Sequence, residues 1–272
     1  MTSPGNRLKA KAGPLSELPG MQGTGLAGLL PTSTLSTAGL VLISYAVVSR
    51  FNELTTLGGE GMNPNPNLLS FFVSNYGRAR VALVGASDWI GEAIRAGQQG
   101  LTPHGDPSLW SHTFILGEVR PDRRGPKRTT GRSPYLFESD LQINPLHAQL
   151  RNGAQENWIG KWCGDEIEHA AFLDFGLSKA EEDTVLGTAL QLCDEQFEYP
   201  LLELVGTWLA IVTKRVWAPN PFDDPHAMYC SAFVRYCFRQ ANRDFLGAEV
   251  SLSNTAPEHI AQSKPFFAEW HR

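Results

Sequence analysis

Apolar residues recur at helical spacing in several segments of the chain. They predict helices over residues 88–94, 178–196, 201–212 and 229–241. Ser178 and Glu181 form the two ends of a capping box at the start of the second helix. The last helix is amphipathic, because its apolar side chains recur at i, i+3, i+4, i+7, i+8 and i+11: Cys230, Phe233, Val234, Cys237, Phe238 and Ala241.

Shorter apolar runs between turn signals predict strands. These runs cover residues 80–84, 111–119, 135–139 and 170–175. Strands mixed with helices in this order favour an α+β domain, in which a small antiparallel sheet packs against helices. We place this domain at residues 77–272.

Residues 1–76 have a different pattern. They are rich in Gly, Pro and Ser, and we expect a flexible N-terminal region with one or two short helices, over 36–58 and 68–76. The apolar run Gly39–Val48 is shorter than the roughly 20 residues that a membrane-spanning helix needs. A long Pro- and Gly-rich gap separates it from the preceding basic residues, which is not typical of a signal peptide. We therefore expect a cytoplasmic protein.

The net charge of −5, from 23 basic and 28 acidic residues, argues against a nucleic-acid partner, because phosphate binding needs a concentrated basic surface. One basic cluster, at residues 120–132, also contains Pro and Gly and is predicted to be a solvated loop. The alternative is a contact with an anionic ligand or a membrane.

The four cysteines form no CxxC pair and no zinc-like spacing with histidine, and their small number fits a reducing compartment. His147, Glu166, Glu168 and His169 lack an HExxH pattern. We therefore expect no metal and no cofactor.

The segment at residues 229–234 reads Tyr-Cys-Ser-Ala-Phe-Val and opens the last predicted helix. A cysteine at a helix N-terminus faces the positive end of the helix dipole and unpaired backbone N–H groups. Both stabilise a thiolate, and the same N–H groups can hold an oxyanion. Cys230 is therefore a candidate nucleophile; the alternative is a small core residue.

The segment at residues 109–116 places His112 at the start of a strand, next to a tight loop. A histidine in this position is exposed on one side and held on the other, as a general base requires. The alternative is an ordinary histidine at a loop edge. His226, four residues before Cys230, is a weaker candidate in a loop rich in Pro and Asp.

These motifs occur in a distinctive order. Ile-Gly-x-x-Ile (90–94) is followed by Trp-Ser-His (110–112), Leu-Phe-Glu (136–138), Tyr-Pro-Leu-Leu (199–202) and Tyr-Cys-Ser-x-x-Val (229–234). The order resembles that of the circularly permuted papain-like cysteine hydrolases of the NlpC superfamily, which are related to the lecithin–retinol acyltransferases. As in that permuted branch, the histidine precedes the cysteine. The resemblance covers about residues 78–245 and implies a permuted papain-like fold.

The resemblance also implies a third catalytic group, a polar residue on the strand that follows the histidine's strand. The matching position is Glu138; the alternative is a purely structural glutamate. We expect Glu138 at a strand end, where its replacement would cost little stability. Glu118 is closer in sequence to His112, but six residues along one strand place it about 20 Å away at ~3.3 Å per residue. The expected substrate-binding residues flank the catalytic ones: Trp110, Ser111, Tyr229 and Ser231.

The function that the resemblance implies is cysteine-dependent hydrolysis of an amide or ester through a thioester, as in an amidase or peptidase. The substrate would be a small molecule, a peptide or a lipid-linked molecule, and membrane contact stays open. Two alternatives remain. One is acyl transfer to an amine or alcohol, and the other is a binding module on the same scaffold without catalysis.

Overall fold

The computed structural model of the chain describes residues 64–121, 132–144, 149–195, 211, 214–217 and 228–272. Several expectations fall outside these residues. They are the flexible segment 1–35, the helix over 36–58, the Tyr-Pro-Leu-Leu segment at 199–202 and nearly all of the helix over 201–212.

A six-stranded sheet forms the centre of the fold, and every pair of neighbouring strands is antiparallel. The order across the sheet is β4-β3-β2-β1-β5-β6. The strands are β1 (Val81–Ala86), β2 (His112–Pro121), β3 (Arg132–Asn144), β4 (Gln149–Trp158), β5 (Ile167–Leu173) and β6 (Ala268–His271). The α+β class expected from the sequence is confirmed.

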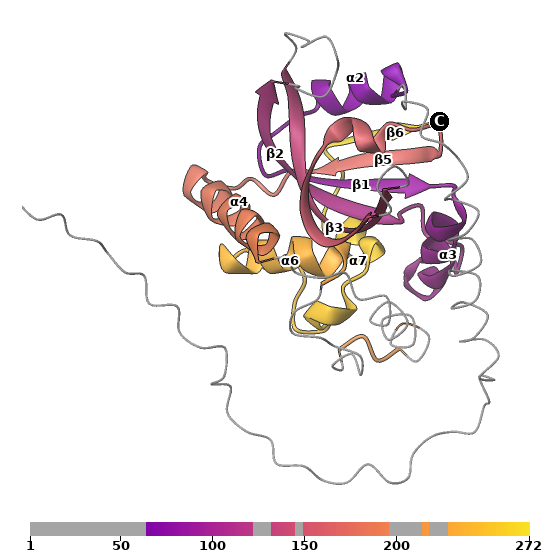
Figure 1. Ribbon diagram of the computed structural model, residues 1–272. Coiled ribbons are helices and arrows are strands. Elements are labelled where there is room, and N and C mark those ends of the chain that lie inside the picture. Colours follow the sequence, from indigo (N-terminus) through magenta and orange to yellow (C-terminus); the bar gives the residue numbers. More distant parts are fainter. Residues whose placement is uncertain (1–63, 122–131, 145–148, 196–210, 212–213, 218–227) are drawn as a thin grey trace, which may run out of the picture. The chain divides into compact units, whose positions relative to one another are not determined.

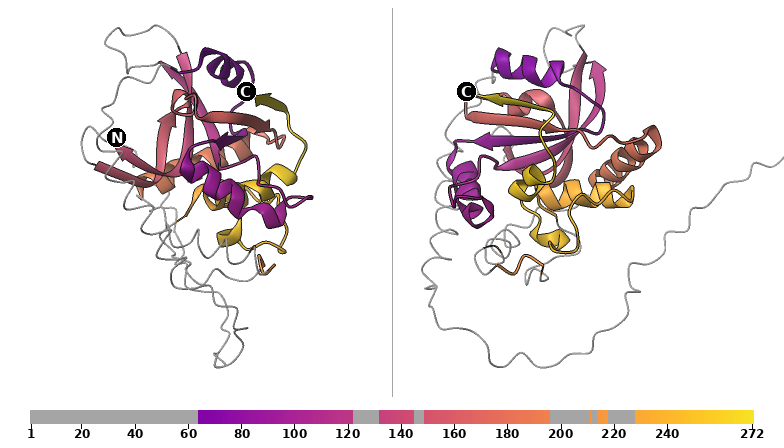
Figure 2. Two further views of the ribbon diagram at one scale, coloured as in Figure 1. Left: turned by 90° about the vertical axis from the view of Figure 1, so that its right-hand side faces the viewer. Right: turned by 180° about the vertical axis from the view of Figure 1, so that it is seen from behind.

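Helices cover both faces of this sheet (Figures 1 and 2). The helices are α2 (Pro66–Ser74), α3 (Trp89–Gly97), α4 (Lys179–Asp194), α6 (Cys230–Gln240) and α7 (Pro257–Gln262). Short 3-10 turns are η1 (Gln99–Leu101), η2 (Ile159–Trp162) and η3 (Leu252–Asn254).

The side chains of β1 alternate between two hydrophobic cores, because successive strand residues point to opposite faces. Val81 and Leu83 pack with residues of α4, α6 and α7, whereas Ala82 and Val84 pack with Leu68 and other residues of α2. All of β1 is therefore buried, which explains its continuous apolar run.

The local signals in the sequence correspond to observed contacts. The side chain of Asp88 caps α3 by accepting a hydrogen bond of 2.6 Å from the Gly91 N–H. The capping box at the start of α4 is present, with Ser178 and Glu181 bonded reciprocally. Strands β1, β2 and β5 overlap the predicted segments, and β3 contains the predicted 135–139.

The basic segment forms a shorter connection than expected. We predicted a loop over residues 120–132, but β2 continues to Pro121 and β3 already begins at Arg132. The end of β2 is held by side chains: Arg120 pairs with Glu156 at 2.8 Å. Residues 122–131 lie outside the described part of the chain.

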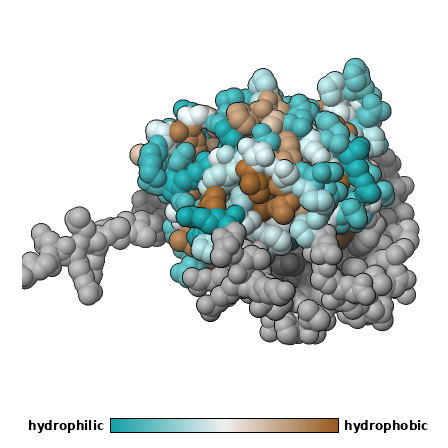
Figure 3. Space-filling model, turned by 90° about the horizontal axis from the view of Figure 1, so that it is seen from above, coloured by the Kyte–Doolittle hydropathy of each residue, from teal (hydrophilic) through white to brown (hydrophobic). Residues whose placement is uncertain are grey.

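Helix α2 packs on the sheet, as its apolar pattern predicts. Leu68 and Phe72 are fully buried in the core that β1, β2 and β5 share, so folded structure begins before Gly77, where we placed the start of the domain. On the face that Figure 3 shows, apolar side chains gather in small groups between polar ones. Within the described ranges, no helix is both long and apolar enough to cross a membrane.

Candidate active site

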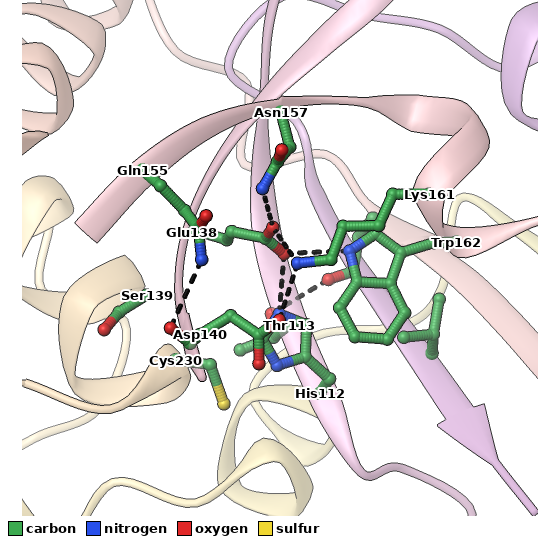
Figure 4. A network of polar contacts seen from close by, with 12 residues as sticks. His112, Thr113, Glu138, Ser139, Asp140, Gln155, Asn157, Lys161, Trp162 and Cys230 are labelled. Carbon is green, nitrogen blue, oxygen red and sulfur yellow. Dashed lines mark hydrogen bonds and ion pairs between the residues drawn. The ribbon is translucent and has the colours of Figure 1, made fainter. Parts of the chain in front are cut away.

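His112 is the first residue of β2 and is almost completely buried. Its Nε2 lies 3.0 Å from Oε2 of Glu138 on the neighbouring strand β3. Its ring stacks on the indole of Trp162, with centroids 4.4 Å apart and planes inclined by 22°. Figure 4 shows the ring beside both the Glu138 carboxylate and the Trp162 indole, so contacts from two different elements define its orientation.

Glu138 lies in the middle of β3 and is fully buried, not at a strand end as expected. Four donors surround its carboxylate. Oε1 accepts from Asn157 Nδ2 (2.7 Å) and Lys161 Nζ (2.6 Å), and Oε2 accepts from Trp162 Nε1 (2.8 Å) and His112 Nε2. The strand-end position on which the expected small stability cost depended is therefore wrong, and we now expect a substitution to break a buried charged network.

The environment of Glu138 favours its ionised form. Burial by itself would raise the pKa of this carboxyl. The positive charge of Lys161 and the hydrogen bond to His112 outweigh burial and lower the pKa to about 2. Glu138 is thus a carboxylate at any physiological pH, and it can act only as an acceptor.

Cys230 is the first residue of α6, which packs against β2 and β3. Its side chain is buried and lies beside the His112 ring (Figure 4). Because Glu138 occupies Nε2, Nδ1 is the ring nitrogen that remains for the thiol. Burial alone would lower the pKa of His112, but the charge of Cys230 and hydrogen bonds with Cys230 and Glu138 raise it to about 10. The surroundings of His112 therefore favour the imidazolium form of its ring.

The N-terminus of α6 leaves backbone donors beside the sulfur. Tyr229 occupies the N-cap position but makes no capping hydrogen bond with its side chain. Its hydroxyl instead donates to the Ser253 carbonyl at 2.7 Å. The first-turn N–H groups of an α-helix have no partner within the helix, so those at Cys230 and Ser231 can stabilise an oxyanion formed at the thiol.

The four expected substrate-binding residues are all buried. Trp110 packs against Phe266 in the core, with ring centroids 5.3 Å apart. The Ser111 hydroxyl accepts from the Ala86 N–H at 3.0 Å and thereby ties β2 to β1. Ser231 Oγ lies 3.6 Å from Cys230 Sγ, so its side chain contacts the sulfur. A role in substrate binding stays a prediction for these residues.

The weaker candidates lie elsewhere or outside the described residues. Glu118 pairs with Arg78 at 2.7 Å, as expected for a residue far along β2 from His112. His169 Nδ1 lies 3.0 Å from His271 Nδ1, and Glu168 pairs with Arg95. His147 and His226 are not among the described residues, which contain no cluster of three or more side chains suited to a metal ion.

Sequence reasoning missed the residues that surround Glu138. Asn157 belongs to β4, and Lys161 and Trp162 belong to η2. The only local signal was the spacing of Gln155 and Asn157, which places both side chains on one face of a strand. A strand with polar residues on its inward face does not show the apolar alternation that predicts strands.

No protein-family model matches the chain, and a comparison with curated proteins finds no significantly similar sequence. The assignment of chemistry to this site therefore depends on its residues and their geometry.

Proposed function

We propose that the protein is a cysteine-dependent hydrolase that cleaves an amide or ester through a thioester, on a circularly permuted papain-like scaffold. The observation that carries the proposal is that Cys230, at the start of α6, lies beside the His112 ring (Figure 4), whose Nε2 lies 3.0 Å from the buried carboxylate of Glu138. A nucleophile, a base and a group that orients the base are the parts that covalent catalysis by a thiol requires.

The chemistry follows from the positions of these groups. The Cys230 thiolate attacks the acyl carbon, and the carbonyl electron pair moves onto the oxygen near the N-terminus of α6. The imidazolium of His112 gives its proton to the leaving amine or alcohol as the thioester forms. Neutral His112 then removes a proton from water, which attacks the thioester and releases the acid and the thiolate. Glu138 holds the ring throughout.

Two features support the permuted scaffold. The histidine's strand lies 118 positions before the cysteine's helix in the chain (230 − 112), and an antiparallel sheet carries both His112 and Glu138. The substrate we propose is a peptide, a small amide or ester, or a lipid-linked molecule. The intact network around Glu138 favours catalysis over a binding module, because a binding module has no need of a buried charge that must be neutralised.

Alkylation with iodoacetamide at pH 7 tests the proposal. We expect Cys230 to react first, because the other thiols are held protonated: burial raises the pKa of Cys163 and of Cys193 to about 12 and that of Cys237 as well. At pH 7 the thiolate fraction of a thiol with a pKa of about 12 is only about 10⁻⁵. Mass spectrometry of tryptic peptides after short exposure measures the site.

Two variants serve as controls for the labelling. Cys230→Ala is expected to abolish rapid labelling of the native protein, and Cys193→Ser to leave it unchanged. Cys193 is the informative comparison, because it is more exposed than Cys230. Labelling of Cys193 at the rate of Cys230 would show that access, not thiolate character, controls the reaction, and would contradict the proposal.

A further inference from the structure

Two carboxylates of β3 lie near the same imidazole. Glu138 and Asp140 are two residues apart and therefore point to one face of the sheet, and Figure 4 shows both beside His112. Nε2 of His112 bonds to Glu138. The negative charge of Asp140 also acts on His112, because it contributes to the raised pKa of the ring. A second carboxylate thus lies near the ring that Glu138 orients.

Lys161 connects these two carboxylates. Its Nζ lies 2.6 Å from Oε1 of Glu138 and 2.6 Å from Oδ2 of Asp140. The ammonium group is mostly buried, and the charges of both carboxylates raise its pKa above the usual value despite that burial. It therefore stays charged, and it binds the oxygen of Glu138 that faces away from the imidazole. The ion pair with this ammonium holds the side chain of Asp140 in place.

We propose that Lys161 is a positioning residue. Its ammonium group holds the Asp140 carboxylate by an ion pair and offsets the charge of that carboxylate, so that Glu138 alone orients His112. The expected effect of Lys161 on the reaction rate rests on the proposed function, whereas its expected effect on the titration of His112 does not. Lys161 touches no reacting atom, so it acts through the two carboxylates. The neighbouring Trp162 completes the arrangement by donating to the same oxygen of Glu138 that faces the imidazole.

The charged groups around His112 come from three elements in the described part of the chain. Helix α6 brings Cys230, β3 brings Glu138 and Asp140, and η2 brings Lys161. On β4, Gln155 and Asn157 share the face of Glu138, and the charged residue between them, Glu156, pairs with Arg120 instead. The carboxylates of Glu138 and Asp140 thus face the ammonium of Lys161 and the ring of His112. Loss of the ammonium leaves both carboxylates without the cation that pairs with them.

The test is a set of three variants with a readout that a purely structural lysine would not move. Lys161→Met is expected to move the alkaline limb of the pH–rate profile to higher pH, because the imidazolium then faces two uncompensated carboxylates. Asp140→Asn alone should move this limb slightly lower and keep kcat within about threefold of wild type. Combined with Lys161→Met, it should return the limb close to its original position, as coupled neighbours do in a double-mutant cycle.

An NMR titration of His112 with labelled histidine supplies the same information without a substrate. If Lys161→Met leaves the titration of His112 unchanged or moves it lower, the proposal is overturned. If Lys161→Met fails to fold, Asp140→Asn decides: a loss of kcat as large as that of Glu138→Gln would show that Asp140 shares the orienting role. Failure of Cys230 labelling together with the expected His112 shifts would remove the proposed function but leave the role of Lys161 in place.

Discussion

Glu138→Gln is expected to lower the turnover of a cleavable ester or amide by about 10- to 10⁴-fold, the range between loss of general acid–base assistance and loss of a triad orienter. The wild-type carboxylate can only accept hydrogen bonds, and it holds the Nε2–H of His112. A glutamine must present an N–H at one of its two terminal atoms, where Lys161, Asn157, Trp162 and His112 all now donate. Two of these donors therefore lose their acceptor, because each carboxylate oxygen accepts from two of them.

The same substitution changes the pH dependence. The pKa of His112 is raised to about 10, with the charge of Cys230 and the hydrogen bond to Glu138 among the causes. Removal of the carboxylate's charge destabilises the imidazolium, so His112 loses its proton at lower pH. Since the leaving group needs that proton, the alkaline limb of the pH–rate profile should move to lower pH. This direction is opposite to the one expected for Lys161→Met.

Rates of wild type and variant between pH 5 and about 11 measure both effects. Glu118→Gln is a matched control, because it makes the same change on the adjacent strand in a residue that pairs with Arg78, outside the site. It should leave the rate and the limb unchanged. An unaltered profile in Glu138→Gln would remove Glu138 from the mechanism and return attention to other polar residues, of which His226 is the first to test.

The parts of the site that the sequence predicts are those with a local pattern. The apolar period after Tyr229 predicts the helix that presents Cys230, and the apolar run after Ser111 predicts the strand that begins at His112. Each pattern depends on burial of neighbouring side chains, so it can be read within one segment. The pairing of these segments followed from the resemblance, not from the periodicity.

The parts that the sequence does not predict depend on partners that are distant along the chain. Asn157 and Lys161 look like ordinary solvated residues, yet both bond to Glu138 from 19 and 23 positions away. The burial of Glu138 itself contradicts its usual preference for the surface, and only these donors make it possible. The sequence pattern did not predict β4 because the side chains of this strand that face the network are polar.

Because the burial of Glu138 depends on these donors, its replacement should have a large effect on the stability of the fold. Glu138→Ala is expected to lower the free energy of unfolding by about 3–5 kcal/mol, because it leaves Lys161 with one carboxylate and removes the acceptor of three further side-chain donors, those of His112, Asn157 and Trp162. Glu118→Ala breaks an ion pair of similar length, 2.7 Å, but its side chain is half exposed. A surface pair of this kind contributes about 0–1 kcal/mol. The difference in burial, not the length of the ion pair, should therefore make Glu138→Ala more destabilising than Glu118→Ala.

Urea denaturation of wild type, Glu138→Ala and Glu118→Ala at pH 7 and at lower pH measures this difference. The folded pKa of Glu138, about 2, lies below the reference value of 4.5. Its stabilising contribution is therefore complete above the unfolded pKa and is lost as the pH falls towards 2. The gap between wild type and Glu138→Ala should accordingly be widest above about pH 5 and narrow in acid. Equal destabilisation by both variants at pH 7 would show that the network around Glu138 contributes no more than a surface ion pair.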